Sequence, residues 1–166
     1  MTNNNLIELD QLPLVDDIAG VIEDMFGVKL DILGGWGYDH NRAVIVNSLD
    51  TSIDHFLYMF ATIRANTEMN MTLEKEKRYG GINATYIDGK QVEVENKIYD
   101  MITFEITAMK ETIYADFIQE YKDNYGKNKE FDLSDHFKRR KENTITIQSD
   151  FWFYGLEKYY VEDSTS

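Results

Sequence analysis

Residues 34–42 combine three glycines with side chains that could do chemistry. The segment reads GGWGYDHNR. Glycine adopts positive φ and allows close backbone approach, so Gly34, Gly35 and Gly37 indicate a tight loop that holds its neighbours at one end of two strands. Its backbone N–H groups could hold an anion with help from Arg42. Because the loop lacks the GxxxxGK[ST] and GxGxxG patterns and leads into a strand, we favour a hairpin loop with Trp36 and Tyr38 packed across it.

Each of the three histidines directly follows an aspartate. Imidazole and carboxylate groups bind divalent metals and act as acids and bases near neutral pH. The spacing matches no compact ligand motif such as HExxH, and adjacent residues point in different directions on a helix or strand. The weak metal candidates are therefore Asp39, His40, His55 and His136. They support an alternative hypothesis, a metal-dependent hydrolase or small-ligand-binding protein that uses residues 36–42 and gathers these groups in one pocket.

Other signatures of catalysis are missing from the sequence. There is no cysteine, which excludes disulfides, thiolate metal sites and a cysteine nucleophile. No GxSxG motif accompanies the serines, and among 30 acidic residues no particular carboxylate pair stands out. We therefore assign no catalytic residue, expect no cofactor, and favour a protein that is not an enzyme.

The charge of the chain is strongly acidic and unevenly distributed. Its 30 acidic and 17 basic residues give a net charge of -13, which repels nucleic-acid phosphates and favours basic partners. No lysine or arginine precedes Lys29, whereas Asp16, Asp17, Glu23 and Asp24 lie in that region. A basic run at 138–141 is predicted to be a solvated helix face or an internal partner for the acidic first helix.

Apolar residues at helical spacing predict several helices. The first covers about 14–26, with Pro13 at its beginning, Asp16 and Asp17 in its first turn, and Gly27 as its stop. A second helix begins near residues 50–51 and ends near 65–66, and its apolar stripe includes position 63 or 64. A third covers 111–125. A short fourth helix, beginning at 132 or 134, carries the basic run.

Alternating apolar residues predict the strands. Residues 28–32 and 43–46 form one hairpin, and residues 69–110 form a meander with a break at Gly80-Gly81 and a tight turn at Asp88-Gly89. Within the meander, the charges at 74–78 suggest a solvated or edge strand. The aromatic cluster at 151–154 is read as a last strand. Together these elements predict an α+β fold, with a mostly antiparallel sheet and three to four helices in one domain spanning 1–166. Residues 1–11 and 162–166 are expected to be loose termini.

The leading hypothesis is a small acidic interaction module. No apolar run is long enough to span a membrane, and residues 1–10 do not resemble a secretory signal, so we expect a cytoplasmic protein with neither a membrane nor a direct nucleic-acid partner. A basic protein partner suits the charge, as for inhibitors such as immunity proteins or phage antagonists of nucleic-acid-binding defence enzymes. The predicted partner-binding residues are Asp16, Asp17, Glu23, Asp24, Trp36 and Tyr38. A third hypothesis is a homo-oligomer that buries the aromatic cluster.

Overall fold

One five-stranded sheet forms the centre of the molecule. The computed structural model describes residues 9–71 and 73–159. The strand order is β1-β2-β5-β4-β3. The strands are β1 (Asp31–Gly34), β2 (Val44–Ser48), β3 (Tyr79–Val94), β4 (Lys97–Lys110) and β5 (Ile145–Tyr154). Neighbouring strands are antiparallel, except that β2 and β5 run parallel.

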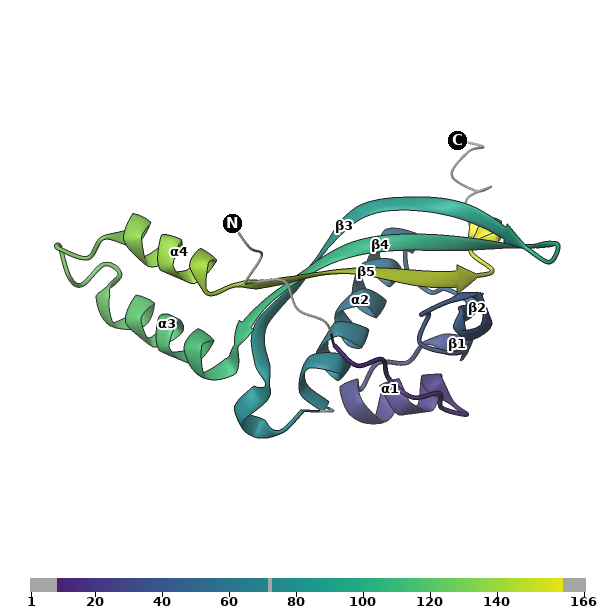
Figure 1. Cartoon of the computed structure of the whole chain (residues 1–166), viewed down its shortest axis with the longest axis horizontal. Coiled ribbons are helices and arrows are strands. Elements are labelled where there is room, and N and C mark those ends of the chain that lie inside the picture. The colour runs from purple at the N-terminus through teal and green to yellow at the C-terminus, as the bar shows by residue number, and fades with distance from the viewer. Residues whose placement is uncertain (1–8, 72, 160–166) are drawn as a thin grey trace.

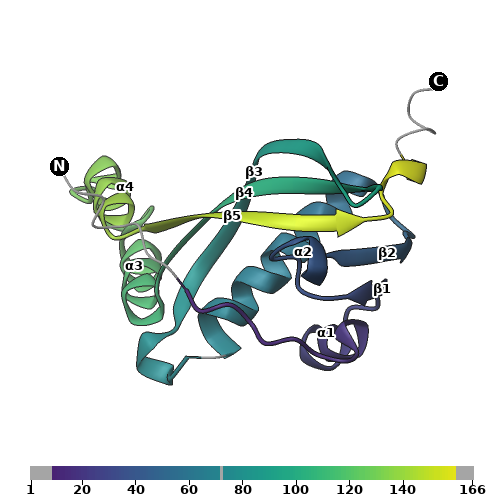
Figure 2. The ribbon, with the colours of Figure 1, turned by 45° about the vertical axis from the view of Figure 1, so that its right-hand side comes forward.

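The helices surround this sheet unevenly. They are α1 (Ile18–Phe26), α2 (Ile53–Asn66), α3 (Glu111–Asn124) and α4 (Leu133–Glu142), with shorter helical turns at His40–Arg42, Thr67–Met71 and Lys75–Lys77. In Figures 1 and 2, α2 lies across one face of the sheet, α1 lies beside β1, and α3 and α4 extend beyond the far end of the long strands. The predicted α+β fold with a mostly antiparallel sheet is confirmed.

The main core forms where α2 packs on the sheet. Phe56 and Phe60 are fully buried, and their ring centroids lie 5.8 and 5.7 Å from that of Phe153 on β5. Phe151, two residues earlier on the same strand face, lies 6.3 Å from Phe60. Such tilted and edge-to-face aromatic pairs add to the hydrophobic stabilisation of the buried area. The predicted stripe on the second helix and the predicted aromatic strand are therefore the two halves of one core.

Strands β3 and β4 form a long hairpin, and the turn predicted at Asp88-Gly89 is wrong. The two strands turn instead at Glu95 and Asn96, whose φ values are 52° and 68°, as a two-residue hairpin turn requires at both central positions. Asp88 and Gly89 lie inside β3, beside a register shift after Tyr86. Gly80-Gly81 also lies at an irregularity within β3 rather than at a break. The strand expected over 74–78 is absent, because Lys75–Lys77 forms a short 3-10 helix.

The first helix is shorter than its apolar spacing predicts. It begins at Ile18, and Asp17 is its N-cap, whose side chain accepts a hydrogen bond from the N–H of Gly20. Asp16 and Asp17 therefore precede the helix, and Leu14 is 71% exposed. A capping aspartate ends the helical conformation on its N-terminal side because its own backbone is not helical. The predicted stop is confirmed, since Gly27 has φ of 70°.

Helices α3 and α4 form a helical hairpin, residues 111–142, inserted between β4 and β5. Both helices occur where the sequence predicts them. Among the described residues, the main core includes no side chain of this hairpin. The hairpin buries Phe117 and His136 within itself instead. It is therefore a separately packed arm attached to the end of the sheet (Figure 1).

Candidate partner-binding surfaces

The glycine-rich loop uses its own backbone groups to hold its shape. Gly34 and Gly37 have φ of 86° and 92°, which confirms that positive φ is needed there. The N–H of Gly35 donates to the carbonyl of Ala43 at 3.1 Å, and the N–H of Gly37 donates to the carbonyl of Arg42 at 2.6 Å. The carbonyl of Gly37 accepts from the N–H of Trp152 on β5 at 2.8 Å. These donors are therefore engaged within the protein rather than turned toward an anion.

Trp36, which the sequence analysis assigned to partner binding, is a core residue. Its side chain is 3% exposed, and its ring centroid lies 6.2 Å from that of Phe60. Tyr38 is half-buried, and its hydroxyl donates to Glu68 at 2.5 Å and accepts from the N–H of Leu12 at 2.9 Å. The correction has a simple cause. The loop lies over the end of α2, so its aromatic rings cover the core instead of facing solvent.

Arg64 is the centre of a buried polar cluster, and the sequence analysis gave this residue no role. Its side chain is 2% exposed, and its guanidinium donates to the carbonyls of Trp36 at 3.2 Å and Asp150 at 3.0 Å. The same group lies 3.6 Å from the centroid of the Phe151 ring, and its Nε lies 3.7 Å from a carboxylate oxygen of Glu68. The sequence signal was its place on the apolar stripe of the second helix. A charged residue on such a stripe indicates a buried polar centre.

Burial determines the ionisation of this centre. It lowers the pKa of Arg64 and raises the pKa of Glu68, against the opposing charge of Arg64. Burial, followed by the charge of Glu68, raises the pKa of Tyr38 above its usual range. The hydroxyl of Tyr38 therefore stays protonated and donates to Glu68 at neutral pH. These contacts join the N-terminal segment, the loop, α2 and β5, so their evident role is structural.

Asp39 and Arg42 are paired with each other. The Asp39 carboxylate accepts from the backbone N–H of Arg42 at 2.9 Å, and from its guanidinium at 2.8 and 3.1 Å. The hydrogen bond from the Arg42 side chain is the main cause of a lowered pKa at Asp39. Arg42 also donates to Gln11 at 2.7 Å. This carboxylate therefore caps the turn at His40–Arg42.

The three histidines lie in different parts of the molecule. His40 packs near Tyr99 and Trp152, His55 is exposed near the start of α2, and His136 is buried in the helical hairpin. The metal hypothesis predicted that the histidines and their aspartates converge in one pocket, and they do not. In the described part of the chain, no group of three or more histidine and acidic side chains could hold a metal ion.

The four acids predicted to bind a partner are exposed together around α1. Asp16 and Asp17 precede the helix, and Glu23 and Asp24 lie on it. Asp17 also caps the helix, and Glu23 lies 3.8 Å from the ammonium group of Lys29. The cluster therefore presents carboxylates to solvent, with one weakly held cation beside it.

A polar groove of 430 Å³ extends this acidic region toward the start of α2. Glu23 lines it together with Asp31 and Asp50, and Lys29 is the cation in its lining. Asp31 accepts hydrogen bonds from Ser48 at 2.6 Å and Asn47 at 2.9 Å, and these lower its pKa. We call the α1 acids and these groove acids the acidic surface: Asp16, Asp17, Glu23, Asp24, Asp31 and Asp50.

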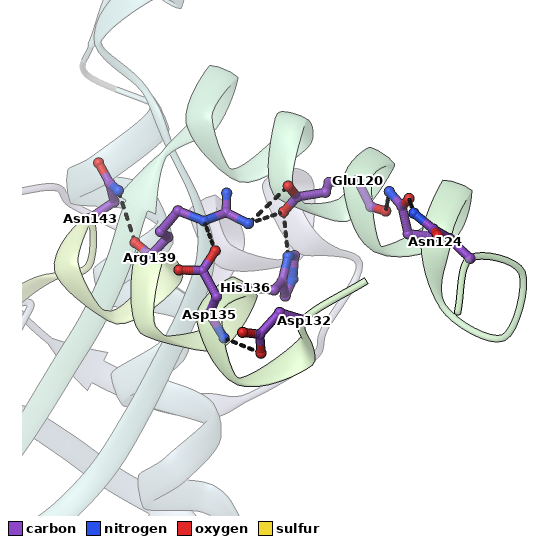
Figure 3. Close-up of polar contacts among 8 residues, drawn as sticks. Glu120, Asn124, Asp132, Asp135, His136, Arg139 and Asn143 are labelled. Atoms are coloured by element: carbon purple, nitrogen blue, oxygen red, sulfur yellow. Dashed lines mark hydrogen bonds and ion pairs between the residues drawn. The ribbon is translucent and has the colours of Figure 1, made fainter. Parts of the chain in front are cut away.

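A buried histidine organises the helical hairpin (Figure 3). His136 is 0% exposed and is surrounded by the rings of Phe117, Tyr121 and Phe131. Its Nδ1 lies 2.5 Å from the carboxylate of Glu120, and Arg139 donates to both oxygens of the same carboxylate at 2.9 and 3.0 Å. Hydrogen bonds from Arg139 and then His136 lower the pKa of Glu120.

The hairpin also settles the role predicted for the basic run. Arg139 pairs with Glu120 of α3 and with Asp135, whose carboxylate accepts from the Arg139 Nε at 2.8 Å. Lys138 and Lys141 are exposed. One member of the run therefore has an internal partner, but that partner is on α3 and not on the acidic first helix.

Charge is divided between the arm and the body of the protein. The hairpin, residues 111–142, contains eight acidic and seven basic side chains, so it carries -1 and the rest of the chain carries -12. The described part of that remainder, which we call the body, surrounds the sheet and includes the acidic surface. The sequence shows that the charge is uneven along the chain. In the fold, the hairpin and the acidic body are two spatially separate parts (Figure 2).

Comparisons with protein-family models, curated proteins and solved structures found no match. Over residues 9–71 and 73–159, no helix combines the length and the apolar character needed to cross a membrane.

Proposed function

We propose that this protein binds a basic protein partner through its acidic surface and thereby inhibits or organises that partner. The observation that carries the proposal is the division of charge, because the helical hairpin, residues 111–142, carries only -1 of the net charge of -13 and the rest of the chain carries -12. A body of one sign attracts a basic surface from a distance and speeds its association. Basic nucleic-acid-binding proteins are the class of partner that best complements this negative charge.

The acidic surface supplies the local chemistry for such a partner. Its carboxylates come from the segment before α1, from α1 itself and from the polar groove. Hydrogen bonds from Ser48 and Asn47 hold the Asp31 carboxylate in place and lower its pKa. Lysine or arginine side chains of a partner would enter the groove between Glu23 and Asp50, displacing the exposed Lys29 from its 3.8 Å contact.

The test is a pull-down with tagged full-length protein from lysate of its native host, at low and high salt. The diagnostic variant replaces Asp16, Glu23 and Asp24 with lysine and leaves Asp17 in place because it caps α1. The matched control replaces Asp116, Asp123 and Glu130 of the hairpin region with lysine. Both variants carry the same net charge, so a difference between them reports the position of the charges.

The expected result is a partner that the wild type and the hairpin control retain at low salt, and that the α1 variant loses. Added duplex DNA should release the partner if it is a nucleic-acid-binding protein that this chain inhibits. Equal retention by all three proteins, or equal loss in both variants, would contradict a specific role for the acidic surface.

A further inference from the structure

An apolar groove of 530 Å³ lies between α2 and the middle of the β3–β4 ribbon. Leu57, Ile102 and Phe104 line its buried part, and the rings of Tyr58 and Tyr86 are 47% and 56% exposed. Among the described residues that line it, Asp54 on α2 is the charged one. An apolar groove between a helix and a sheet can accept the apolar face of a helix.

The same face of the ribbon continues toward its tip with apolar and acidic character. Ile98 shares a strand face with Ile102, four residues away on β4, and is 37% exposed. Glu93 lies directly opposite Ile98 on β3 and is exposed on that face. Asp54 and Glu93 therefore border an apolar surface, and no lysine or arginine is among the described residues that line its groove.

The helical hairpin presents the complementary features. Tyr125, Leu133 and Phe137 are 55%, 36% and 49% exposed. Tyr121 stacks on Tyr125 with centroids 4.8 Å apart and lies 6.3 Å from Phe137, so the rings form one ridge across both helices. We call Tyr121, Tyr125, Leu133 and Phe137 the hairpin ridge. Cations adjoin it, because the Arg140 guanidinium lies 5.4 Å from the Phe137 ring and Lys141 is exposed one turn further on.

We propose that the hairpin ridge of one copy of this protein docks in the apolar groove of a second copy. The ridge supplies aromatic anchors and neighbouring cations, and the groove supplies an apolar floor bordered by Asp54 and Glu93. Because the hairpin carries a net charge of only -1, its approach avoids much of the repulsion that two acidic bodies would experience. This proposal does not depend on the acidic surface or on the proposed function.

The placement of the two surfaces makes the contact intermolecular. In Figures 1 and 2 the hairpin extends away from the body, beyond the end of the sheet. The groove is lined by residues of α2, β3 and β4 within the body. A contact between two different surfaces is heterologous, so it forms a ring where the rotation closes and a chain where it does not. The small size of the groove favours a weak association, with a Kd in the micromolar to millimolar range.

Sedimentation velocity over a wide range of protein concentration tests the proposal. The hairpin variant is Phe137→Glu, and the groove variant is Tyr58→Arg, which places a cation where the cations of the hairpin would approach. Both side chains are about half exposed, so the fold is expected to persist, and circular dichroism checks it. Matched controls make the same changes at exposed apolar positions elsewhere: Leu14→Glu and Leu33→Arg.

The expected result is concentration-dependent association of the wild type and both controls, weakened about thirtyfold or more in each interface variant, as for a buried aromatic anchor. An equimolar mixture of the two interface variants should form a one-to-one dimer that grows no further, because it retains one intact ridge facing one intact groove. A monomeric wild type at every concentration would overturn the proposal. So would a mixture that stays monomeric, or loss of association in Leu33→Arg alone, which would place the contact on the opposite face of the sheet.

Discussion

At the scale of single residues, Arg64 joins segments that are far apart in the sequence. Its guanidinium bridges the carbonyls of Trp36 and Asp150 and stacks on Phe151. Removing one partner of a buried ion pair leaves the other charge uncompensated, which costs more than the pair itself contributes. The arrangement therefore makes the fold sensitive to this one side chain.

We expect Arg64→Met to lower the free energy of unfolding by about 3 kcal/mol, because Glu68 would remain buried beside an apolar side chain. The double variant Arg64→Met with Glu68→Leu should recover part of this loss, since neither charge then remains. Urea unfolding followed by circular dichroism measures both values. A double variant that is no more stable than the single one would show that the cost comes from lost packing.

Gly34 and Gly27 both have positive φ, but they differ in the space available for an added Cβ. An added Cβ would lie 2.3 Å from the carbonyl oxygen of Ala43 at Gly34, whereas nothing lies within 4 Å of it at Gly27. Gly27→Ala should cost about 1 kcal/mol for the left-handed backbone alone. Gly34→Ala should cost about 2 kcal/mol more, because a backbone atom must move. Equal losses in urea unfolding would mean that the loop adjusts without strain.

At the scale of elements, the helical hairpin has a small core of its own, although Tyr114 of α3 packs against Gly80 and Gly81 of β3. The hairpin packs around His136, and the main core draws on none of its described residues. Ala108 of β4 pairs directly with Ile145 of β5, so the two strands already face each other where the hairpin leaves the sheet. A short turn would therefore be able to join them.

Replacing residues 110–143 with Asn-Gly should leave a folded body, because the pair then joins Met109 to Thr144, the positions next to the Ala108–Ile145 pair. An Asn-Gly pair favours the two-residue turn that antiparallel strands use. The expected result is a cooperative urea transition and well-dispersed NMR signals from β1, β2 and α2 that match those of the whole chain. Collapse of those signals would show that the arm contributes to the main core.

Glu120 makes the hairpin sensitive to acid. Its pKa lies below the ordinary value of 4.5, chiefly because Arg139 donates to it. A carboxylate with a depressed pKa stabilises the folded state above its unfolded pKa, and this stabilisation is lost as the pH falls through the folded pKa. The side chain is 31% exposed, so solvent screening reduces the effect.

Hydrogen-exchange protection of the α3 and α4 amides should therefore decrease from neutral pH toward about pH 3 in the wild type. In Glu120→Gln the same amides should be less protected at neutral pH and should change less with acid. Protection in β4 and β5 serves as the internal control. Parallel pH profiles for the two proteins in α3 and α4 would rule out Glu120 as the cause.

At the scale of the whole molecule, the net charge of -13 opposes compactness, because it is concentrated in the body. Raising salt from about 10 mM to about 150 mM shortens the screening length from about 30 Å to about 8 Å. We expect the melting temperature to rise by about 3 °C, equivalent to about 1 kcal/mol for a chain of this size. The variant with lysine at positions 16, 23 and 24 should show a smaller rise, and a fall in the wild type would indicate that favourable ion pairs dominate.

The elements were largely predictable because their signals are local. The apolar stripes of α2 and α3, the stop at Gly27 and the last strand all depend on side chains within a few residues of each other. Four local predictions failed: the start of the first helix, the turn at Asp88-Gly89, the break at Gly80-Gly81 and the strand over 74–78. The first two have the same kind of cause. Asp17 interrupts the first helix by capping it, and Glu95 and Asn96 form the turn expected at Asp88-Gly89. In both cases a rival residue nearby satisfies the same geometric requirement.

The candidate site was predictable only in part. Its residue types can be read from short stretches of sequence, but the residues that pack against them come from distant segments. The sequence alone determined the fold class and the excess of acid. Only the tertiary structure showed that the acids around α1 are exposed, placed Trp36 in the core, separated the three histidines and made Arg64 the centre of a buried polar cluster. Periodicity shows which face of an element is apolar, but strand order and long-range packing decide what that face meets. The parallel pairing of β2 with β5, about a hundred residues apart in the sequence, is such a contact.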